Sequence, residues 1–341
     1  MKFFQTKYVT EFEGIPLNGV RRRAFNKLNQ DIYSQKIKIN QIKECFCGAS
    51  NFLALSQLDR FGLPFGSQIC QSCGLVTQKI RIDESSMKHF YENIYWPLIE
   101  GKEGNYFTFS KESHPDPFFS SQMNFEKKEI IIFEVGCGAG NRILNLSSIF
   151  EKKGYVVEKC GCDYSINALK VAQNRKIKTV QGGMKDLANL GKADIVILSH
   201  VFEHFTDLKV AMAELEKLVH EKSFIYVEVP GINDLENKKE YKYNYQMYNV
   251  LAHTYNFSLQ SLTNVMNYGG FELITGDEFV RTLFKLSKKD SFKSEFISAF
   301  SDTMISLEKA NVKSEKYKRF RNSYFVNYLI KIIKAFLARD I

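Results

Sequence analysis

Beyond the first third of the chain, short apolar runs alternate with amphipathic segments. The runs at residues 130–135, 194–199 and 223–229 are mostly apolar, which is typical of strands buried on both faces of a parallel sheet. Between them, residues 141–150 and 207–219 carry apolar side chains at helical spacing. Strands that alternate with helices in this way predict an α/β fold.

Four further segments complete the predicted sheet. They are a second strand at 155–162, a third near 178–180, and a closing antiparallel pair at 271–274 and 279–284. Together with the three apolar runs they make seven strands. The expected fold class is therefore α/β, with a Rossmann-like seven-stranded sheet over residues 129–286.

Near its end the chain has an apolar stripe with a spacing of three and four residues. The stripe consists of Phe325, Tyr328, Leu329, Ile332, Ile333, Phe336 and Leu337. It predicts an amphipathic helix with Lys331 and Lys334 on the opposite face. Such a helix can lie on an anionic membrane surface, here through residues 325–337, but more commonly it packs on the parent domain or on a second subunit.

Composition and charge narrow the class of protein. A hydrophobic content of 44% and a charged content of 25% are those of a globular protein. The sequence has no apolar run of about 18 residues and no signal peptide at its start, so we expect a cytoplasmic protein. Residues 281–341 contain 14 Lys and Arg against 6 Asp and Glu, a surplus of 8 within the net charge of +9. A basic excess confined to this segment argues against a nucleic-acid-binding face.

Four of the seven cysteines form two close pairs, Cys45 with Cys47 and Cys70 with Cys73. Without a secretory signal, paired cysteines are more often metal ligands than disulfides. Gly48 and Gly74 follow the pairs and would allow the tight turns that such ligands need. Four thiolates predict a closed, structural Zn²⁺ site, although the first pair has an unusually short spacing. The alternative is four unligated thiols.

The first buried strand runs directly into a turn that contains Gly136, Gly138 and Gly140. Glycines at a strand-to-helix turn allow a ligand to approach bare backbone. Asp163 ends the second strand, where a carboxylate can accept both ribose hydroxyls of a nucleoside, or can simply begin the next helix. Glu134 precedes the turn.

Two motifs of this region resemble class I S-adenosylmethionine-dependent methyltransferases. Glu134 followed by Gly-x-Gly-x-Gly resembles their motif I, and His200-Val201-Phe202-Glu203-His204 resembles their (His/Asn)-Val-Leu-Glu-His signature. Farther upstream, Cys73-Gly74-Leu75-Val76 and Phe90-Tyr91 with Tyr95 resemble bacterial members of the family that carry a zinc ribbon before the catalytic domain.

The resemblance implies S-adenosylmethionine as cofactor. Its expected contacts are Glu134, Gly136, Gly138, Gly140, Asp163, His200 and, beside the adenine, the turn at Met184 and Asp186. Methyl transfer is an in-line displacement that also needs a base where the acceptor is a hydroxyl. The candidates are His204, His253 and His200, and His204 has the alternative of bonding backbone at a helix start.

The absence of several motifs excludes some classes of methyl acceptor. The chain has no Pro-Cys pair and no Pro-Pro-Tyr after the fourth strand, and Val250-Leu251-Ala252-His253 stands where related sugar C-methyltransferases have Tyr-His-Glu-His. We therefore expect O-methylation of a sugar, a nucleotide sugar or another small metabolite. The alternative is a zinc-ribbon binding module, directed at nucleic acid or protein, on a catalytically idle methyltransferase fold.

The same observations predict how the chain is divided. The expected parts are an N-terminal extension (1–44), a zinc-ribbon module (45–96), a linker (97–128), the cofactor-binding domain (129–286) and a basic helical segment (287–341). The expected partner is a small-molecule acceptor rather than nucleic acid. The sequence leaves the oligomeric state open.

Overall fold

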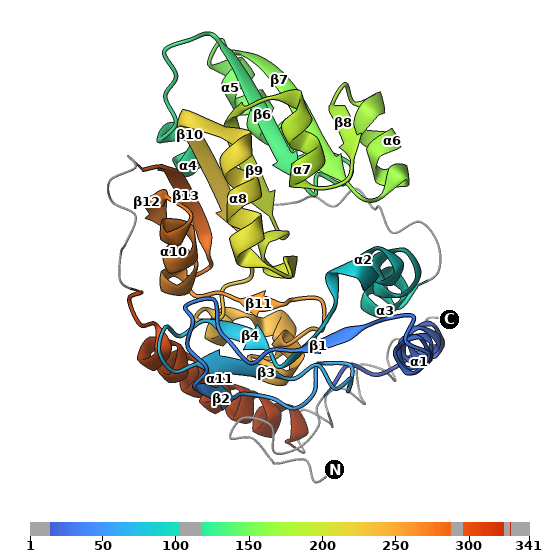
Figure 1. Cartoon of the computed structure of the whole chain (residues 1–341). Coiled ribbons are helices and arrows are strands. Elements are labelled where there is room, and N and C mark those ends of the chain that lie inside the picture. Colours follow the sequence, from blue (N-terminus) through green and yellow to red (C-terminus); the bar gives the residue numbers. More distant parts are fainter. Residues whose placement is uncertain (1–13, 103–116, 288–295, 324–327, 329–341) are drawn as a thin grey trace.

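The computed structural model describes residues 14–102, 117–287, 296–323 and 328 (Figure 1). Seven strands form one sheet in the order β12-β13-β10-β9-β6-β7-β8. They are β6 (Glu129–Val135), β7 (Val156–Asp163), β8 (Lys178–Gln181), β9 (Ala193–Ser199), β10 (Val219–Glu228), β12 (Phe271–Gly276) and β13 (Arg281–Leu286). All neighbours are parallel except β13, which is antiparallel to both β10 and β12. The predicted α/β, Rossmann-like seven-stranded sheet is confirmed.

The strand order puts the carboxyl ends of β6 and β9 side by side. The chain leaves β6, builds β7 and β8 on one side, and returns to β9 on the other. In open α/β sheets, ligands bind at such a switch point, outside the carboxyl ends of the strands. The predicted glycine turn and the predicted histidine motif follow these two strands.

Helices cover both faces of the sheet and make two separate cores. One face carries α4 (Pro117–Ser121), α5 (Asn141–Lys152) and α6 (Ile166–Asn174), and the other carries α7 (Met184–Leu187), α8 (Leu208–Leu218) and α10 (Leu259–Tyr268). Short 3₁₀ turns follow α7 and β9, namely η2 (Ala188–Leu190) and η3 (Phe202–His204). Because the central strands are buried on both sides, their apolar runs are nearly continuous.

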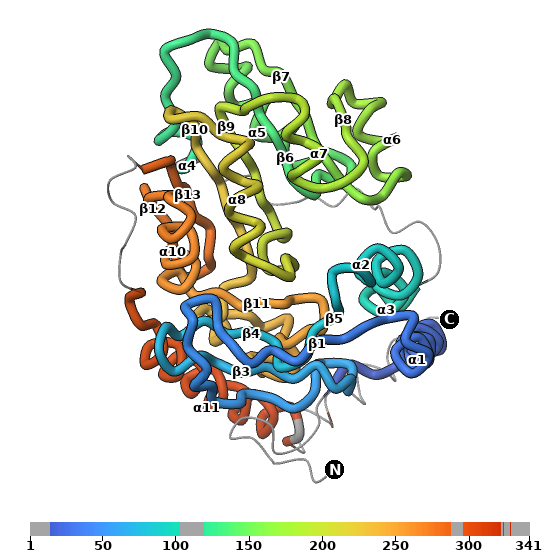
Figure 2. Tube along the Cα trace, in the orientation of Figure 1, coloured from blue at the N-terminus to red at the C-terminus, as the bar shows by residue number. Residues whose placement is uncertain are grey.

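A second, smaller sheet lies beyond the carboxyl ends of the large one (Figures 1 and 2). Its order is β11-β4-β3-β2, and its strands are β2 (Phe52–Ala54), β3 (Ser67–Cys70), β4 (Val76–Gln78) and β11 (Tyr255–Asn256). Three strands come from the expected ribbon, but β11 comes from the expected cofactor-binding domain, with Tyr255 opposite Thr77. The two expected domains therefore share a sheet.

The N-terminal helices and the smaller sheet together form a second body of the molecule. They are α1 (Gly19–Tyr33), α2 (Glu84–Phe90), the π-helical turn η1 (Tyr91–Tyr95) and α3 (Trp96–Glu100), and a two-stranded sheet of β1 (Ile39–Gln41) and β5 (Ile80–Ile82) lies beside them. Their core includes Leu28, Phe90 and Leu98, together with Leu251 from the segment before β11. The segment before β11, which contains Leu251, thus holds these helices against the ribbon.

The Tyr-rich insert after β10 is part of the core. It forms η4 (Leu235–Asn237), η5 (Lys239–Tyr241) and α9 (Tyr245–Tyr248). Tyr245 and Tyr248 are buried, and their hydroxyls reach Ser67 Oγ at 2.7 Å and the carbonyl oxygen of Pro230 at 2.6 Å. At least these two tyrosines are used to pack the second body.

The C-terminal helix α11 (Phe300–Asn322) packs against this insert. It begins where the amide of Ala299 donates to the carbonyl of Cys73 at 3.0 Å. The amphipathic stripe at 325–337, with its possible membrane contact, lies outside the described residues except for Tyr328. Among the residues that are described, no helix is long and apolar enough to cross a membrane.

Candidate active site

The turn after β6 brings three glycines with positive φ to the switch point. The φ angles are +66° at Gly136, +51° at Gly138 and +80° at Gly140, a region that L side chains rarely adopt. A Cβ at Gly136 would lie 2.5 Å from Val201 Cγ2, so this turn contacts the loop after β9. At Gly138 a Cβ would meet no atom within 4 Å in the described part of the chain, which leaves this backbone open to a ligand.

Glu134 fixes the helix that follows the turn. Its buried carboxylate accepts a hydrogen bond from the amide of Ile143, in the first turn of α5, at 3.0 Å. A carboxylate at a helix N-terminus is also favoured by the helix dipole. Glu134 therefore ties the end of β6 to α5 and holds the turn between them.

Asp163, at the end of β7, lies against the same turn. Its Oδ2 accepts from the amide of Gly138 at 3.0 Å, and its Oδ1 accepts from the amide of Ser165 at 2.7 Å. Burial raises the pKa of Asp163, while these amides act in the opposite direction. The carboxylate thus lies beside the open backbone of Gly138.

The turn after β8 provides the third side of this site. Met184 is buried in the core, so only its backbone can face a ligand. Asp186 caps α7 by accepting from the amide of Gly183 at 3.0 Å. The side chain of Tyr164 is exposed beside Gly183, an aromatic surface that the sequence pattern did not single out.

The histidine motif folds around a buried carboxylate. Glu203, 1% exposed, lies with its Oε1 3.6 Å from His200 Nδ1 and 3.8 Å from His204 Nε2. His253 arrives from the segment before β11, and its ring centroid lies 5.0 Å from that of His204. The structure therefore brings together all three histidines that the sequence proposed as bases. His200 has a φ of +54°, a strained conformation found often at functional sites.

Burial and mutual charge set the protonation of this cluster. Burial lowers the pKa of His253 to about 3, and it also lowers the pKa of His204. Burial would raise the pKa of Glu203, but His204, His200 and His253 outweigh it and lower that pKa to about 2. The pKa of His200 is raised, because its contact with Glu203 outweighs burial. Near neutral pH, Glu203 is therefore anionic, and His204 and His253 are neutral.

Two tyrosines of the second body close over the cluster. Tyr91 OH lies 3.0 Å from His204 Nδ1, and the ring centroids of Tyr91 and Tyr95 are both 6.3 Å from that of His204. Both tyrosines lie in η1, where the wider π turn brings their side chains to the same place. Such π turns occur often at functional sites. In the sequence, these tyrosines were notable only as part of the family resemblance.

A buried ion pair supports His200 from the other side. Arg142 Nη1 lies 2.7 Å from Glu228 Oε2, and Glu228 Oε1 lies 3.8 Å from His200 Nε2. The carbonyl of Glu228 also accepts from the amide of His200 at 2.8 Å. Because Arg142 is in α5, this pair connects the histidine loop to the helix that follows the glycine turn.

Arg60 adds a cation to the second body near this site. Its Nε is buried and makes no hydrogen bond in the described part of the chain, and its guanidinium lies over the ring of Phe61. Burial lowers the pKa of Arg60. Its charge acts on His253 and Tyr95, among the groups of the cluster. Nothing in the local sequence marked this arginine.

The four paired cysteines meet in space. Cys45 Sγ lies 3.5 Å from Cys73 Sγ, and Cys47 Sγ lies 3.7 Å from Cys70 Sγ. All four sulfurs lie within 4.8 Å of one another, and the four cysteines are free of disulfides. A tetrahedral ion with Zn–S bonds of 2.3 Å needs sulfurs about 3.8 Å apart. Gly48 and Gly74 have φ of +86° and +79°, as the predicted turns require.

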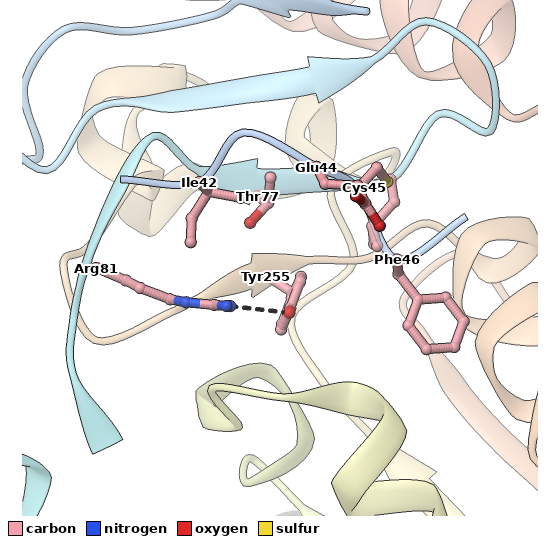
Figure 3. A pocket seen from close by; sticks show the side chains of 8 residues that line it. Ile42, Glu44, Cys45, Phe46, Thr77, Arg81 and Tyr255 are labelled. Atoms are coloured by element: carbon pink, nitrogen blue, oxygen red, sulfur yellow. Dashed lines mark hydrogen bonds between the residues drawn. The ribbon is translucent and has the colours of Figure 1, made fainter. Parts of the chain in front are cut away.

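A small cavity lies beside the first cysteine pair (Figure 3). It has a volume of about 20 Å³ and lies between Cys45, Thr77 and Tyr255, where Arg81 Nη1 donates to Tyr255 OH at 3.0 Å. This volume suits a single water molecule. The cavity is therefore part of the contact between the ribbon and β11 and is too small for a substrate.

Residues 117–275 match a family model described as a methyltransferase domain, a span that includes the glycine turn, Asp163 and the histidine cluster. No curated protein matches the sequence. Among solved structures, the chain is similar to a TehB-like S-adenosylmethionine-dependent methyltransferase from Corynebacterium glutamicum, at 14% identity over 60% of this chain and 100% of that chain, with a TM-score of 0.36.

A second similar structure is the plantazolicin methyltransferase BamL in complex with a triazolic desmethylPZN analogue and SAH. It is 20% identical over 58% of this chain and 74% of that chain, with a TM-score of 0.37.

Proposed function

Residues 117–275 form an S-adenosylmethionine-dependent methyltransferase domain, and from this premise we propose that the chain methylates a hydroxyl group of a small molecule. The acceptor we favour is a sugar, a nucleotide sugar or a similar metabolite. The observation that carries this proposal is the cluster of Glu203, His200 and His204 after β9 with His253 from the segment before β11. Since Val201 contacts the glycine turn, this cluster lies next to the cofactor site.

The cofactor residues proposed from the sequence fit S-adenosylmethionine. Gly138 leaves its backbone open, and Asp163 stands beside it with a carboxylate that can accept the ribose hydroxyls. Glu134 and Gly136 hold the turn, while Met184 and Asp186 belong to the turn proposed to flank the adenine. When bound, the cofactor supplies an electrophilic methyl group on a sulfonium.

The histidines would handle the proton of the acceptor. A hydroxyl must lose its proton as its oxygen attacks the methyl carbon, and an imidazole beside a carboxylate can take it. His204, His253 and His200, the three bases proposed from the sequence, all lie around Glu203. Tyr91 orients the ring of His204.

Arg60 favours an acceptor that carries an anionic group. Its guanidinium acts electrostatically on the cluster, and its buried Nε makes no hydrogen bond among the described residues. A phosphate or carboxylate on the acceptor would satisfy it. The diphosphate of a nucleotide sugar meets this requirement.

We also propose that Cys45, Cys47, Cys70 and Cys73 hold a structural Zn²⁺. Their sulfur separations fit a tetrahedral ion, and four thiolate ligands leave no open position for a substrate. The ion would stabilise the ribbon and take no part in the reaction.

Titration of S-adenosylmethionine into the purified chain by calorimetry tests the cofactor site. We expect binding in the micromolar range for the wild type and a loss of at least tenfold in Asp163→Ala, because the ribose loses its acceptor. An acceptor screen would then begin with nucleotide sugars, using release of S-adenosylhomocysteine as readout. Absence of binding to the wild type would contradict the enzyme and favour a ribbon module on an idle fold.

A further inference from the structure

Several buried polar atoms in the cluster of Glu203 and the three histidines lack hydrogen bonds in the described part of the chain. Neither carboxylate oxygen of Glu203 makes a hydrogen bond in the described part of the chain, and neither does Nδ1 of His253. The contacts of Glu203 with His200 and His204, at 3.6 and 3.8 Å, are too long for hydrogen bonds. A buried carboxylate and a buried imidazole nitrogen in this state each cost free energy, unless a bound group satisfies them.

One ion could bind three side chains of this cluster. Glu203, His204 and His253 each offer one ligand atom, and these atoms all lie within 4.8 Å of one another. A tetrahedral ion with bonds of about 2.0–2.1 Å to nitrogen and oxygen requires ligand atoms about 3.4 Å apart. The Glu203–His204 pair at 3.8 Å is within about half an ångström of that value.

The surroundings of the cluster orient its ligands. Tyr91 OH engages Nδ1 of His204 at 3.0 Å, and Nε2 of the same ring lies 3.8 Å from Glu203 Oε1. Metal-bound histidines almost always use their second ring nitrogen in a hydrogen bond of this kind. The burial of Glu203 also excludes the water that would otherwise solvate its charge.

We propose that Glu203, His204 and His253 bind a divalent transition-metal ion, with zinc the best match, at a second metal site distinct from the four cysteines. Two imidazoles and one carboxylate are the ligands of catalytic zinc sites, which keep the fourth position open. A ligand set of this type also suits other divalent ions of the first transition row.

The open position would receive the hydroxyl oxygen of the acceptor, and this part of the inference rests on the proposed function. A bound cation lowers the pKa of a coordinated hydroxyl. The hydroxyl proton would pass to the neutral form of His200, which is not among the proposed ligands. The oxygen then bonds to the methyl carbon as the carbon–sulfur bond breaks, and the electron pair of that bond stays on sulfur.

Metal counting on the full chain tests the site. After loading with Zn²⁺ and removal of loosely bound ions, we expect two equivalents per wild-type chain and one in Glu203→Gln and in His253→Ala. His220→Ala is the matched control, because His220 pairs with Asp194 on the large sheet and lies outside the cluster. It should keep two equivalents.

Substitution with Co²⁺ separates the two sites by their ligands. Thiolates give intense charge-transfer absorption, whereas a site of nitrogen and oxygen ligands gives only weak ligand-field bands. We expect Glu203→Gln to lose the weak bands alone. A wild type that holds one ion, with a pure thiolate spectrum and the same count in Glu203→Gln, would overturn the second site. Calorimetric binding of S-adenosylmethionine to these variants reports separately on the proposed function.

Discussion

Gly138 and Gly154 share a backbone conformation but lie at opposite ends of the large sheet. Their φ angles are +51° and +84°, and a Cβ at either one would meet no atom within 4 Å of the described chain. Gly138 follows the carboxyl end of β6, and Gly154 precedes β7. Substitution by alanine therefore strains both positions in the same way, and only Gly138 lies where the cofactor is proposed to bind.

We expect Gly138→Ala to weaken the binding of S-adenosylmethionine at least tenfold, because the added methyl group occupies the approach to the turn. Its cost in stability should be about 1–2 kcal/mol, the cost of a left-handed L residue. Gly154→Ala should show the same small loss in thermal unfolding with unchanged cofactor affinity, as measured by calorimetry. Equal affinities in the two variants would mean that the cofactor does not approach Gly138.

At the scale of elements, the π turn η1 brings two tyrosines of the second body to the site. Tyr91 reaches His204 through its hydroxyl, whereas Tyr95 contacts the same histidine with its ring. The tyrosines are four positions apart, and one extra residue in the turn changes how their side chains align. The hydroxyl of Tyr91 and the ring of Tyr95 therefore have separable roles.

Tyr91→Phe should lower the affinity of the second metal site by roughly tenfold or more, because the loss of a hydrogen bond to a metal-bound histidine has this effect. Tyr95→Phe keeps the ring contact and should leave the affinity within about twofold. Competition with a chelator of known affinity measures both. If the two variants behaved alike, the Tyr91 hydroxyl would have no role in orienting His204.

Local signals explain which elements the sequence could predict. The buried strands appear as continuous apolar runs, and the glycine turn and the Glu203–His204 motif each lie within a few residues. The two-residue strand β11 has no such signal, since it is defined only by pairing with β4, far away in the sequence. Arg60 is likewise recognisable only after the second body has folded against the large sheet.

At the scale of the whole molecule, the ribbon is bound to the rest of the chain at two places. β4 pairs with β11, and the carbonyl of Cys73 accepts from the amide of Ala299 at the start of α11. Gly74 makes the second contact possible, because a Cβ there would lie 2.4 Å from the backbone of Ala299. The cysteine cluster thus supports a contact between three distant parts of the sequence.

We therefore expect loss of the ribbon ion to destabilise the chain as a whole. Cys70→Ser should lower the Tm in calorimetry by roughly 2–4 °C for each kcal/mol lost, within a single cooperative transition. Cys160→Ala, which removes a buried thiol of β7 away from the cluster, serves as the control and should shift the Tm much less. Chelation of the wild type should reproduce the effect of Cys70→Ser.

Two separate unfolding transitions in Cys70→Ser would show that the two bodies unfold independently. In that case Cys70→Ser would produce an early transition for the second body and leave a later one unchanged. Because β11 leads directly from His253 into the ribbon sheet, early unfolding of the second body would also displace His253 from Glu203. The number of transitions in Cys70→Ser therefore decides whether the ribbon ion acts on the site through the shared sheet.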